Sequence, residues 1–215
     1  MKAVVIGATG ATGSDLLKLL LQDTRFDEVT ILVRHNPGVS HSKLKTYIVN
    51  FDYEDTWQHL VAGDVLFSCL GTTLKEAGDK AGQWKIDYSY QLKVAEAAKA
   101  NGVSHCIIIS SVGADEKSPL FYLRMKGQLD EAIKQLHFTK TTILKPPALI
   151  REYTDRLGEK VMLKALGIFN KMGLMKERRP MPTSVVAQAM LTASIIQAPG
   201  AVTWEADDIW RAGQK

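Results

Sequence analysis

The chain has 215 residues, of which 46% are hydrophobic and 23% are charged, and its formal net charge is +4. These values are typical of a soluble globular protein, and the length favours a single domain over residues 1–215. The mild charge gives no support for a nucleic-acid partner, and no run reaches the roughly 18 apolar residues of a membrane span. Because the first strand begins at once, no signal peptide is expected and a cytoplasmic location is predicted.

An apolar run over residues 2–7, a glycine-rich turn and an amphipathic helix pattern follow one another without a gap. The turn has the sequence GATGATG, so its glycines are three residues apart. Glycine permits a tight turn and a close approach of the backbone to a pyrophosphate, and the free N–H groups of the following helix face the negative charge. This order predicts a dinucleotide site that contains Gly7, Thr9, Gly10, Ala11, Thr12 and Gly13.

Short apolar runs alternate with helical patterns along the rest of the chain, which predicts βαβ units and a parallel sheet. Further strands are predicted at about 29–34, 46–50, 64–70, 105–110, 140–145 and 201–205. Helices are predicted at about 12–22, 54–61, 82–101, 119–136, 153–176 and 183–197, with a turn at the carboxyl end. The expected fold is α/β, a Rossmann-type doubly wound parallel sheet with a small C-terminal lobe, about 147–182, that covers the substrate.

Polar and basic residues follow several of the predicted strands, at the edge where open parallel sheets bind ligands. Arg34 and His35 follow the second strand, where an NAD-selective site would carry an acidic residue, and their charge favours the 2′-phosphate of NADP. Asn50 and Phe51 follow the third strand, and this end is suitably polar for the adenine amino group. Further cofactor contacts are expected after the fourth strand, from Leu70, Gly71, Thr72 and Thr73.

A tyrosine and a lysine four residues apart follow the fifth predicted strand. Residues at this spacing lie on one helix face, so Lys126 is expected beside Tyr122. A nearby ammonium favours the phenolate and would lower the pKa of Tyr122, which suits a proton donor and acceptor. Ser110 or Ser111, at the end of the strand, could polarise a substrate carbonyl.

The chain resembles the short-chain dehydrogenase/reductase superfamily in its atypical branch. The similarity is greater still to the Tat-interactive-protein oxidoreductase group of NAD(P)H-binding proteins and its bacterial relatives. It extends over residues 3–190. The motifs that carry it are the glycine turn, the paired serines, the YxxxK spacing and the segments 29–34, 69–73, 113–115 and 145–149.

The resemblance implies NADPH binding, with Tyr122 as the general acid/base and Lys126 holding the nicotinamide ribose. It also implies that Ser110 or Ser111 polarises the carbonyl, without deciding between them. By position, other residues match those that hold the 2′-phosphate or line the cofactor, namely Arg34, His35, Leu70, Gly71 and Leu149.

Two departures from the family pattern concern cofactor-binding positions. Family members more often carry Asp where this chain has Asn50, so an acceptor is kept but its charge is lost. They often have Arg-Pro-Gly where this chain has Lys145, Pro146 and Pro147. Pro146 is nevertheless expected to contact the nicotinamide side of the cofactor.

These features predict an NADPH-dependent oxidoreductase that reduces the carbonyl of a small molecule by hydride transfer. No metal is expected, because the histidines and cysteines lack ligand spacing. The protein is expected to be a monomer or a homodimer. The alternative is a regulator that senses NADP(H) without turnover. Related sensor folds keep the glycine loop but usually lose the tyrosine, so Tyr122 and Lys126 favour an enzyme.

Overall fold

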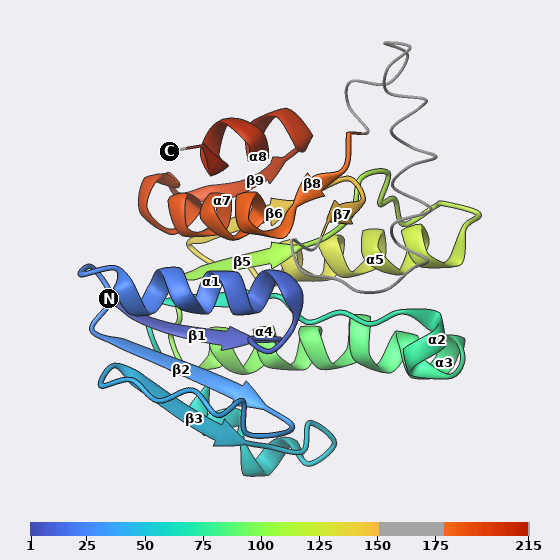
Figure 1. Cartoon of the computed structure of the whole chain (residues 1–215). Helices are drawn as coiled ribbons and strands as arrows, with labels where there is room; N and C mark the ends of the chain where they lie inside the picture. The colour runs from blue at the N-terminus through green and yellow to red at the C-terminus, as the bar shows by residue number, and fades with distance from the viewer. Residues whose placement is uncertain (151–178, 215) are drawn as a thin grey trace.

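The computed structural model describes residues 1–150 and 179–214. Within these ranges seven parallel strands form one sheet in the order β3-β2-β1-β4-β5-β6-β9 (Figure 1). The strand order reverses between β1 and β4, where doubly wound sheets bind ligands. The predicted Rossmann-type fold is therefore confirmed. The strands are β1 (Lys2–Ile6), β2 (Glu28–Val33), β3 (Leu44–Ile48), β4 (Val65–Ser68), β5 (His105–Ile109), β6 (Lys140–Leu144) and β9 (Gly200–Trp204).

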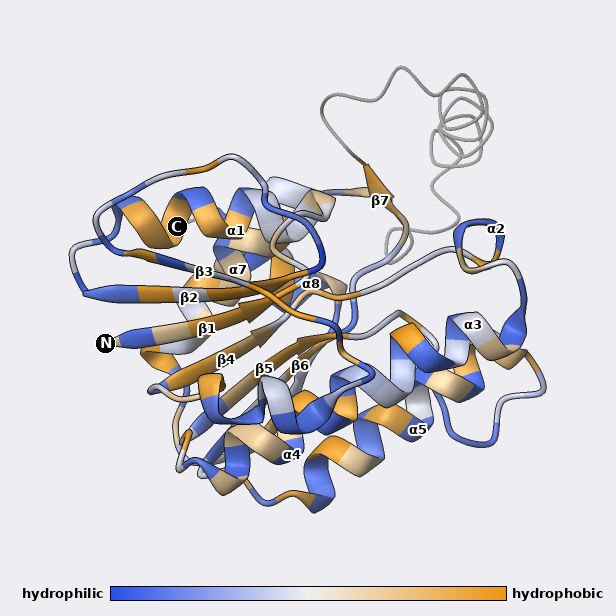
Figure 2. Ribbon diagram, turned by 90° about the horizontal axis from the view of Figure 1, so that it is seen from below, coloured by the Kyte–Doolittle hydropathy of each residue, from blue (hydrophilic) through white to orange (hydrophobic). Residues whose placement is uncertain are grey.

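Helices cover both faces of the sheet (Figure 2). One face packs against α1 (Ala11–Gln22), α7 (Thr183–Ile196) and α8 (Ala206–Gly213). The other packs against α4 (Gln91–Ala100) and α5 (Phe121–Gln135). Shorter elements lie beyond the carboxyl edge of the strands or connect to it: α2 (Leu74–Ala77), α3 (Lys80–Trp84) and the two-stranded pair β7 (Leu149–Ile150) and β8 (Met181–Pro182).

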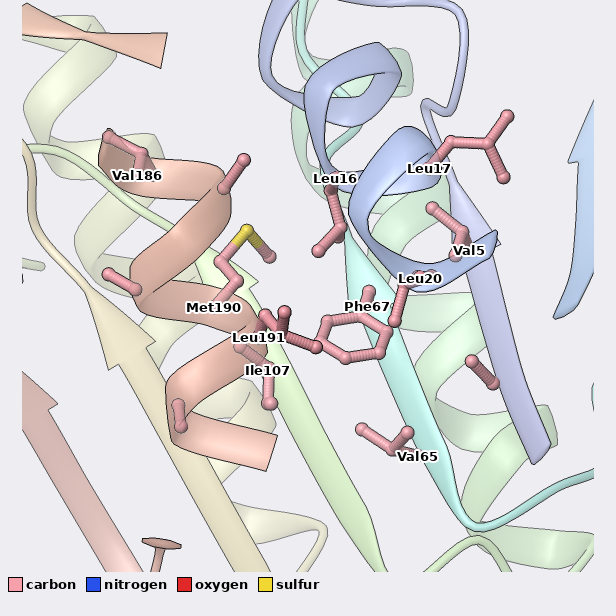
Figure 3. Packing of buried hydrophobic residues seen from close by; sticks show 14 of the residues in the cluster. Val5, Leu16, Leu17, Leu20, Val65, Phe67, Ile107, Val186, Met190 and Leu191 are labelled. Atoms are coloured by element: carbon pink, nitrogen blue, oxygen red, sulfur yellow. The ribbon is translucent and has the colours of Figure 1, made fainter. Parts of the chain in front are cut away.

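Side chains alternate between the two faces along each central strand, as the pleat requires. In β1, Val5 joins the core beneath α1 and α7, whereas Val4 joins the core beneath α4 and α5. Phe67 of β4 is fully buried between side chains of α1 and α7, including Leu20 and Leu191 (Figure 3). The hydrophobic runs of the sequence thus correspond to strands that are covered on both sides.

The predicted helix at 54–61 is wrong. Two 3₁₀ turns occupy this region, Glu54–Thr56 and Gln58–Leu60, and Trp57 between them has φ −132°, outside the helical range. Its indole is fully buried and meets the ring of Phe51 at a centroid distance of 5.7 Å. Packing of this one side chain therefore overrides the helical spacing of the apolar residues.

The carboxyl end also differs from the expected turn, because it forms the helix α8. Glu205 and Asp208 make a reciprocal capping box at its start, each side chain accepting a hydrogen bond from the other's backbone N–H. The helix predicted at 153–176 lies outside the described residues, as does most of the predicted lobe at 147–182. In the part of the chain that is described, no helix is both long and apolar enough to cross a membrane.

The helix predicted at 82–101 is divided into three consecutive segments. It begins as α3, where the Asp79 side chain accepts a hydrogen bond from the backbone N–H of Gly82 at 2.7 Å. It continues as a π-helical turn, η3 (Lys85–Tyr90), and ends as α4. A π turn is rare and occurs frequently at functional sites. Here it directs Asp87 into the protein, as described below.

Truncation of Phe67 tests the packing between α1 and α7. Phe67→Ala is expected to lower the free energy of unfolding by about 3–5 kcal/mol, since it removes a buried ring and leaves a cavity. Chemical denaturation would measure this loss. Ile196→Ala, at an exposed position of α7, should change the same quantity by less than about 0.5 kcal/mol. Equal losses for the two variants would contradict the described core.

Candidate functional site

The glycine turn brings β1, α1 and the end of β4 closer together than side chains would allow. Gly7 has φ +74°, and a Cβ at this position would lie 2.5 Å from the backbone of Cys69. A Cβ on Gly13 would overlap the carbonyl oxygen of Gly7. Gly10 is the N-cap of α1 and is exposed, so the first N–H groups of the helix are open to a ligand.

A cleft of about 420 Å³ opens beside this turn, at the carboxyl edge of the sheet. It also borders Cys69, Glu76, Ile109, Pro147, Ala148 and Thr183, which were not predicted as site residues. The fold thus brings together residues that lie far apart in the sequence. The predicted site residues that line the cleft are Gly10, Ala11, Thr12, Leu70, Gly71, Thr72, Thr73, Ser110, Ser111, Tyr122, Lys126, Pro146 and Leu149.

Other predicted residues do not line this cleft. Gly7 and Gly13 lie beneath the turn, and Thr9 is exposed on it. Arg34, His35 and Asn50 are exposed after β2 and β3. The ends of these two strands are adjacent, since the N–H of Val49 donates to the carbonyl of Val33 at 2.8 Å.

Phe51 is buried, in contrast to Asn50 beside it. Its ring packs against Trp57 and lies 5.4 Å from the ring of Tyr90, centroid to centroid. Only its backbone is therefore available to a ligand. The Asn50 side-chain oxygen accepts a hydrogen bond from the backbone N–H of Asp52 at 3.0 Å, which orients this strand end.

The two candidate serines have different surroundings. Ser110 is buried, and its hydroxyl donates to Oδ2 of Asp130 at 2.8 Å. Ser111 is half-buried on the cleft, where its hydroxyl donates to the carbonyl of Val112 at 3.4 Å and also influences the pKa of Tyr122. Lys126 is buried, and its Nζ donates to the carbonyl of Ile109 at 2.8 Å. The tyrosine, the lysine and both serines therefore converge on the end of β5.

The pKa of the Tyr122 phenol differs from the expectation that Lys126 lowers it. Burial of the hydroxyl and the negative charge of Asp87 raise this pKa to about 12, although the ring is partly exposed to the cleft. The hydroxyl of Ser111 opposes this increase, whereas Lys126 has no resolved influence on the pKa of Tyr122. The predicted lowering is therefore wrong for this structure, because the surrounding low-dielectric environment and the carboxylate dominate.

Asp87 is a site residue that the sequence analysis missed. It is 2% exposed, and its Oδ1 accepts a hydrogen bond from the backbone N–H of Thr72 at 2.7 Å. Gln83 donates to the carbonyl of the same threonine at 3.2 Å, so the two side chains hold the loop after β4. Burial raises the pKa of Asp87 to about 6, against the opposing charge of Lys126. Its helical spacing from the apolar residues Val94, Ala95 and Ala98 was a signal for it.

The fold and the cleft define a class of protein. A glycine turn leads into a helix N-terminus at the point where the strand order reverses, and a serine, a tyrosine and a lysine lie at the same edge. This arrangement is that of a dinucleotide-binding Rossmann protein of the short-chain dehydrogenase/reductase type.

Comparison with known proteins identifies the family. Residues 7–193 match the family described as NAD(P)H-binding, and the chain belongs to this family, in the atypical short-chain dehydrogenase/reductase group that includes HTATIP2. Protein HTATIP2 of Rattus norvegicus is 34% identical over 168 residues, which are 76% of this chain and 69% of that protein. Protein FMP52, mitochondrial, of Kluyveromyces lactis is 40% identical over 182 residues, 81% of this chain and 80% of that protein. Membership indicates a nicotinamide dinucleotide as the cofactor.

Solved structures of low sequence identity have the same fold. UDP-glucose 4-epimerase of Thermotoga maritima has a TM-score of 0.72 at 15% identity, over 95% of this chain and 77% of that one. A short-chain dehydrogenase/reductase superfamily protein of Agrobacterium tumefaciens, with bound NAD, has a TM-score of 0.70 at 14% identity, over 96% of this chain and 78% of that one. These structures support the architecture of the whole sheet.

The relatives also correct the predicted location. FMP52 proteins of Kluyveromyces lactis, Candida albicans and Eremothecium gossypii are all named mitochondrial. The prediction of a cytoplasmic protein is contradicted by these names. It had rested on the early first strand, which does not report a cell compartment.

The raised pKa of Asp87 predicts how stability depends on pH. The fold favours the protonated carboxyl, so this group stabilises the protein below about pH 4 and loses that contribution as the pH rises through about 6. Asp87→Asn cannot titrate. The stability of this variant relative to the wild type should therefore rise by about 2 kcal/mol between pH 4 and pH 7, measured by denaturant unfolding.

Thr192→Val provides a control for this pH dependence. It removes a buried hydroxyl that donates to the carbonyl of Ala212 at 3.1 Å, and it changes no titratable group. Its stability relative to the wild type should be the same at both pH values. A constant difference for Asp87→Asn as well would show that the pKa of Asp87 is not raised by folding.

Proposed function

We propose that the protein is an NADPH-dependent reductase that converts a small-molecule carbonyl to an alcohol. The observation that carries this proposal is that Tyr122 and Ser111 line the same cleft as the N-terminus of α1. A dinucleotide whose pyrophosphate lay at that N-terminus would extend along the carboxyl edge toward the phenol. Bound NADPH would supply a hydride to the carbonyl carbon.

The side chains of the cleft would handle the proton and the oxygen. Tyr122 keeps its proton across the neutral range, because its pKa is raised to about 12, and it donates that proton to the carbonyl oxygen. Ser111 donates a hydrogen bond to the same oxygen. Of the two serines Ser111 is assigned this role, since Ser110 is buried and donates to Asp130 at 2.8 Å, whereas the hydrogen bond of Ser111 to the carbonyl of Val112 is long, at 3.4 Å. Solvent returns a proton to the phenolate after the alcohol leaves.

The ammonium of Lys126 would hold the ribose of the cofactor beside Tyr122 by charge-assisted hydrogen bonds. The backbone of the loop at Leu70, Gly71 and Thr72 would pass along the cofactor. Asp87 and Gln83 support this assignment, because they fix the peptide groups of Thr72.

The preference for NADPH over NADH would come from the exposed strand ends outside the main cleft. Arg34 and His35 follow β2, at the place where an NAD-selective site would have an acidic residue to accept hydrogen bonds from the ribose 2′-OH. A guanidinium binds a phosphate by charge and by paired hydrogen bonds. We therefore assign the 2′-phosphate to these two residues, with Asn50 near the adenine.

Replacement of the tyrosine tests the proposed chemistry. Tyr122→Phe is expected to bind NADPH within about twofold of the wild type but to lose roughly 10²–10⁴-fold in kcat for carbonyl reduction, since it removes the proton donor. Calorimetry would measure binding, and loss of reduced-cofactor absorbance with a panel of carbonyl compounds would measure turnover. Tyr53→Phe, at an exposed position, should leave both unchanged.

Two other outcomes of these assays would count against the proposal. Unchanged turnover by Tyr122→Phe would remove the tyrosine from the mechanism. Tight NADPH binding by a wild type that reduces no member of the panel would favour the alternative of a sensor without turnover.

Replacement of the arginine tests the cofactor preference. Arg34→Ala is expected to weaken NADPH binding by about tenfold or more, because a charge-assisted contact contributes about 1.5–3 kcal/mol, and to leave NADH binding nearly unchanged. Calorimetric titration with each dinucleotide would measure both. Arg211→Ala is the control, since this exposed guanidinium pairs with Asp208 on α8. Equal losses for the two dinucleotides would refute the assignment.

A further inference from the structure

A buried carboxylate lies on α5, one turn beyond Lys126. Asp130 is 2% exposed, and it occupies the same helix face as Tyr122 and Lys126, because the three residues are spaced by four. A carboxylate is almost never buried unless it is paired. The partners of Asp130 therefore indicate what it does.

The two carboxyl oxygens of Asp130 are used differently. Oδ2 accepts a hydrogen bond from the hydroxyl of Ser110 at 2.8 Å and lies 3.5 Å from Nζ of Lys145. Nζ of Lys145 in turn donates to the carbonyl of Ala114 at 2.9 Å. Oδ1 is buried and has no hydrogen-bond partner among the described residues. Because Oδ1 makes no hydrogen bond, the carboxylate can still interact with a positive charge nearby.

Lys126 has fewer hydrogen-bond acceptors around it than its ammonium group could use. Its Nζ carries three donors, and the one hydrogen bond that the described residues provide goes to the carbonyl of Ile109. The ammonium is buried, so solvent does not stabilise it. Its charge is balanced instead by two buried carboxyl groups, Asp87 from η3 and Asp130 from its own helix.

We propose that Asp130 is a positioning residue for the proposed reaction, whose negative charge keeps the buried Lys126 in its ammonium form and whose Oδ2 holds Ser110 away from the substrate. This inference rests on the proposed function only for its kinetic consequence. The electrostatic effect on Lys126 belongs to the folded protein itself.

The charges around Lys126 determine whether a substitution raises or lowers its pKa. Burial lowers the pKa of Lys126, whereas the charges of Asp87 and Asp130 raise it. Lys145 offsets part of the charge of Asp130, and Tyr122 faces the same region from the preceding turn. Removing the negative charge of Asp130 must therefore lower the pKa of Lys126.

The direct test is a titration of Lys126 in the protein without NADPH or substrate. The ε-methylene signal of Lys126 would be followed by NMR and assigned by its loss in Lys126→Arg. Asp130→Asn, which can still accept from Ser110, should lower the pKa of Lys126 by about one unit. Asp130→Glu should restore most of it. Glu131→Gln is the matched control, because Glu131 is the next residue along α5 and pairs with Lys134 at 2.7 Å, and it should cause no shift.

The kinetic test uses the same variants with NADPH and a carbonyl substrate. Activity requires the ammonium, so the alkaline limb of the kcat profile should move to lower pH by about one unit in Asp130→Asn and stay in place in Asp130→Glu and Glu131→Gln. A residue that merely supported the fold would lower kcat at every pH without moving this limb.

The outcomes separate this inference from the proposed function. An unchanged Lys126 titration in Asp130→Asn overturns the inference, even where Tyr122→Phe behaves as expected. Turnover that survives in Tyr122→Phe overturns the proposed function and leaves the NMR result standing. If Asp130→Asn fails to unfold cooperatively, Asp130→Leu takes its place, since it removes the same charge and leaves no polar group of its own without a partner, and it should lower the Lys126 pKa in the same way. The absence of any lowering would also overturn the inference.

Discussion

The close contact of three backbone segments is the constraint on which the rest of the structure depends. Gly7, Gly13 and the backbone of Cys69 lie so close together that a Cβ on either glycine would overlap another main-chain group. This contact sets the start of α1 directly over the gap between β1 and β4. The N–H groups of α1 are therefore aimed at the carboxyl edge, where loops from more distant parts of the sequence also end.

The strands and the site residues could be predicted from the sequence to different extents. Runs such as 105–109 are apolar without interruption, and their hydrophobicity alone identifies strands covered on both faces. The 3₁₀ turns around Trp57 could not be predicted, because their geometry follows from the burial of one indole. Short elements such as β7 and α8 likewise depend on tertiary pairing and on a reciprocal cap, which local patterns specify weakly.

At the site, residue identity was easier to predict than electrostatic environment. The spacing of Tyr122 and Lys126 places them correctly on one helix face, but spacing does not reveal burial or the carboxylates that surround them. Asp87 comes from a π turn and Asp130 from the next turn of α5, and both act on Lys126. The balance of charges in the cleft is thus a property of the π turn and α5 together, and no single motif contains it.

The position of α7 over the sheet has a consequence for synthesis on the ribosome. Residues of α7 complete the core that covers Phe67 and Ile107, although α7 follows β4 and β5 by many residues in the chain (Figure 3). The edge strand β9, which pairs with β6, emerges later still. A nascent polypeptide that has been translated only through β6 therefore exposes an apolar sheet face, and chaperones that bind such surfaces would engage it at that stage of elongation.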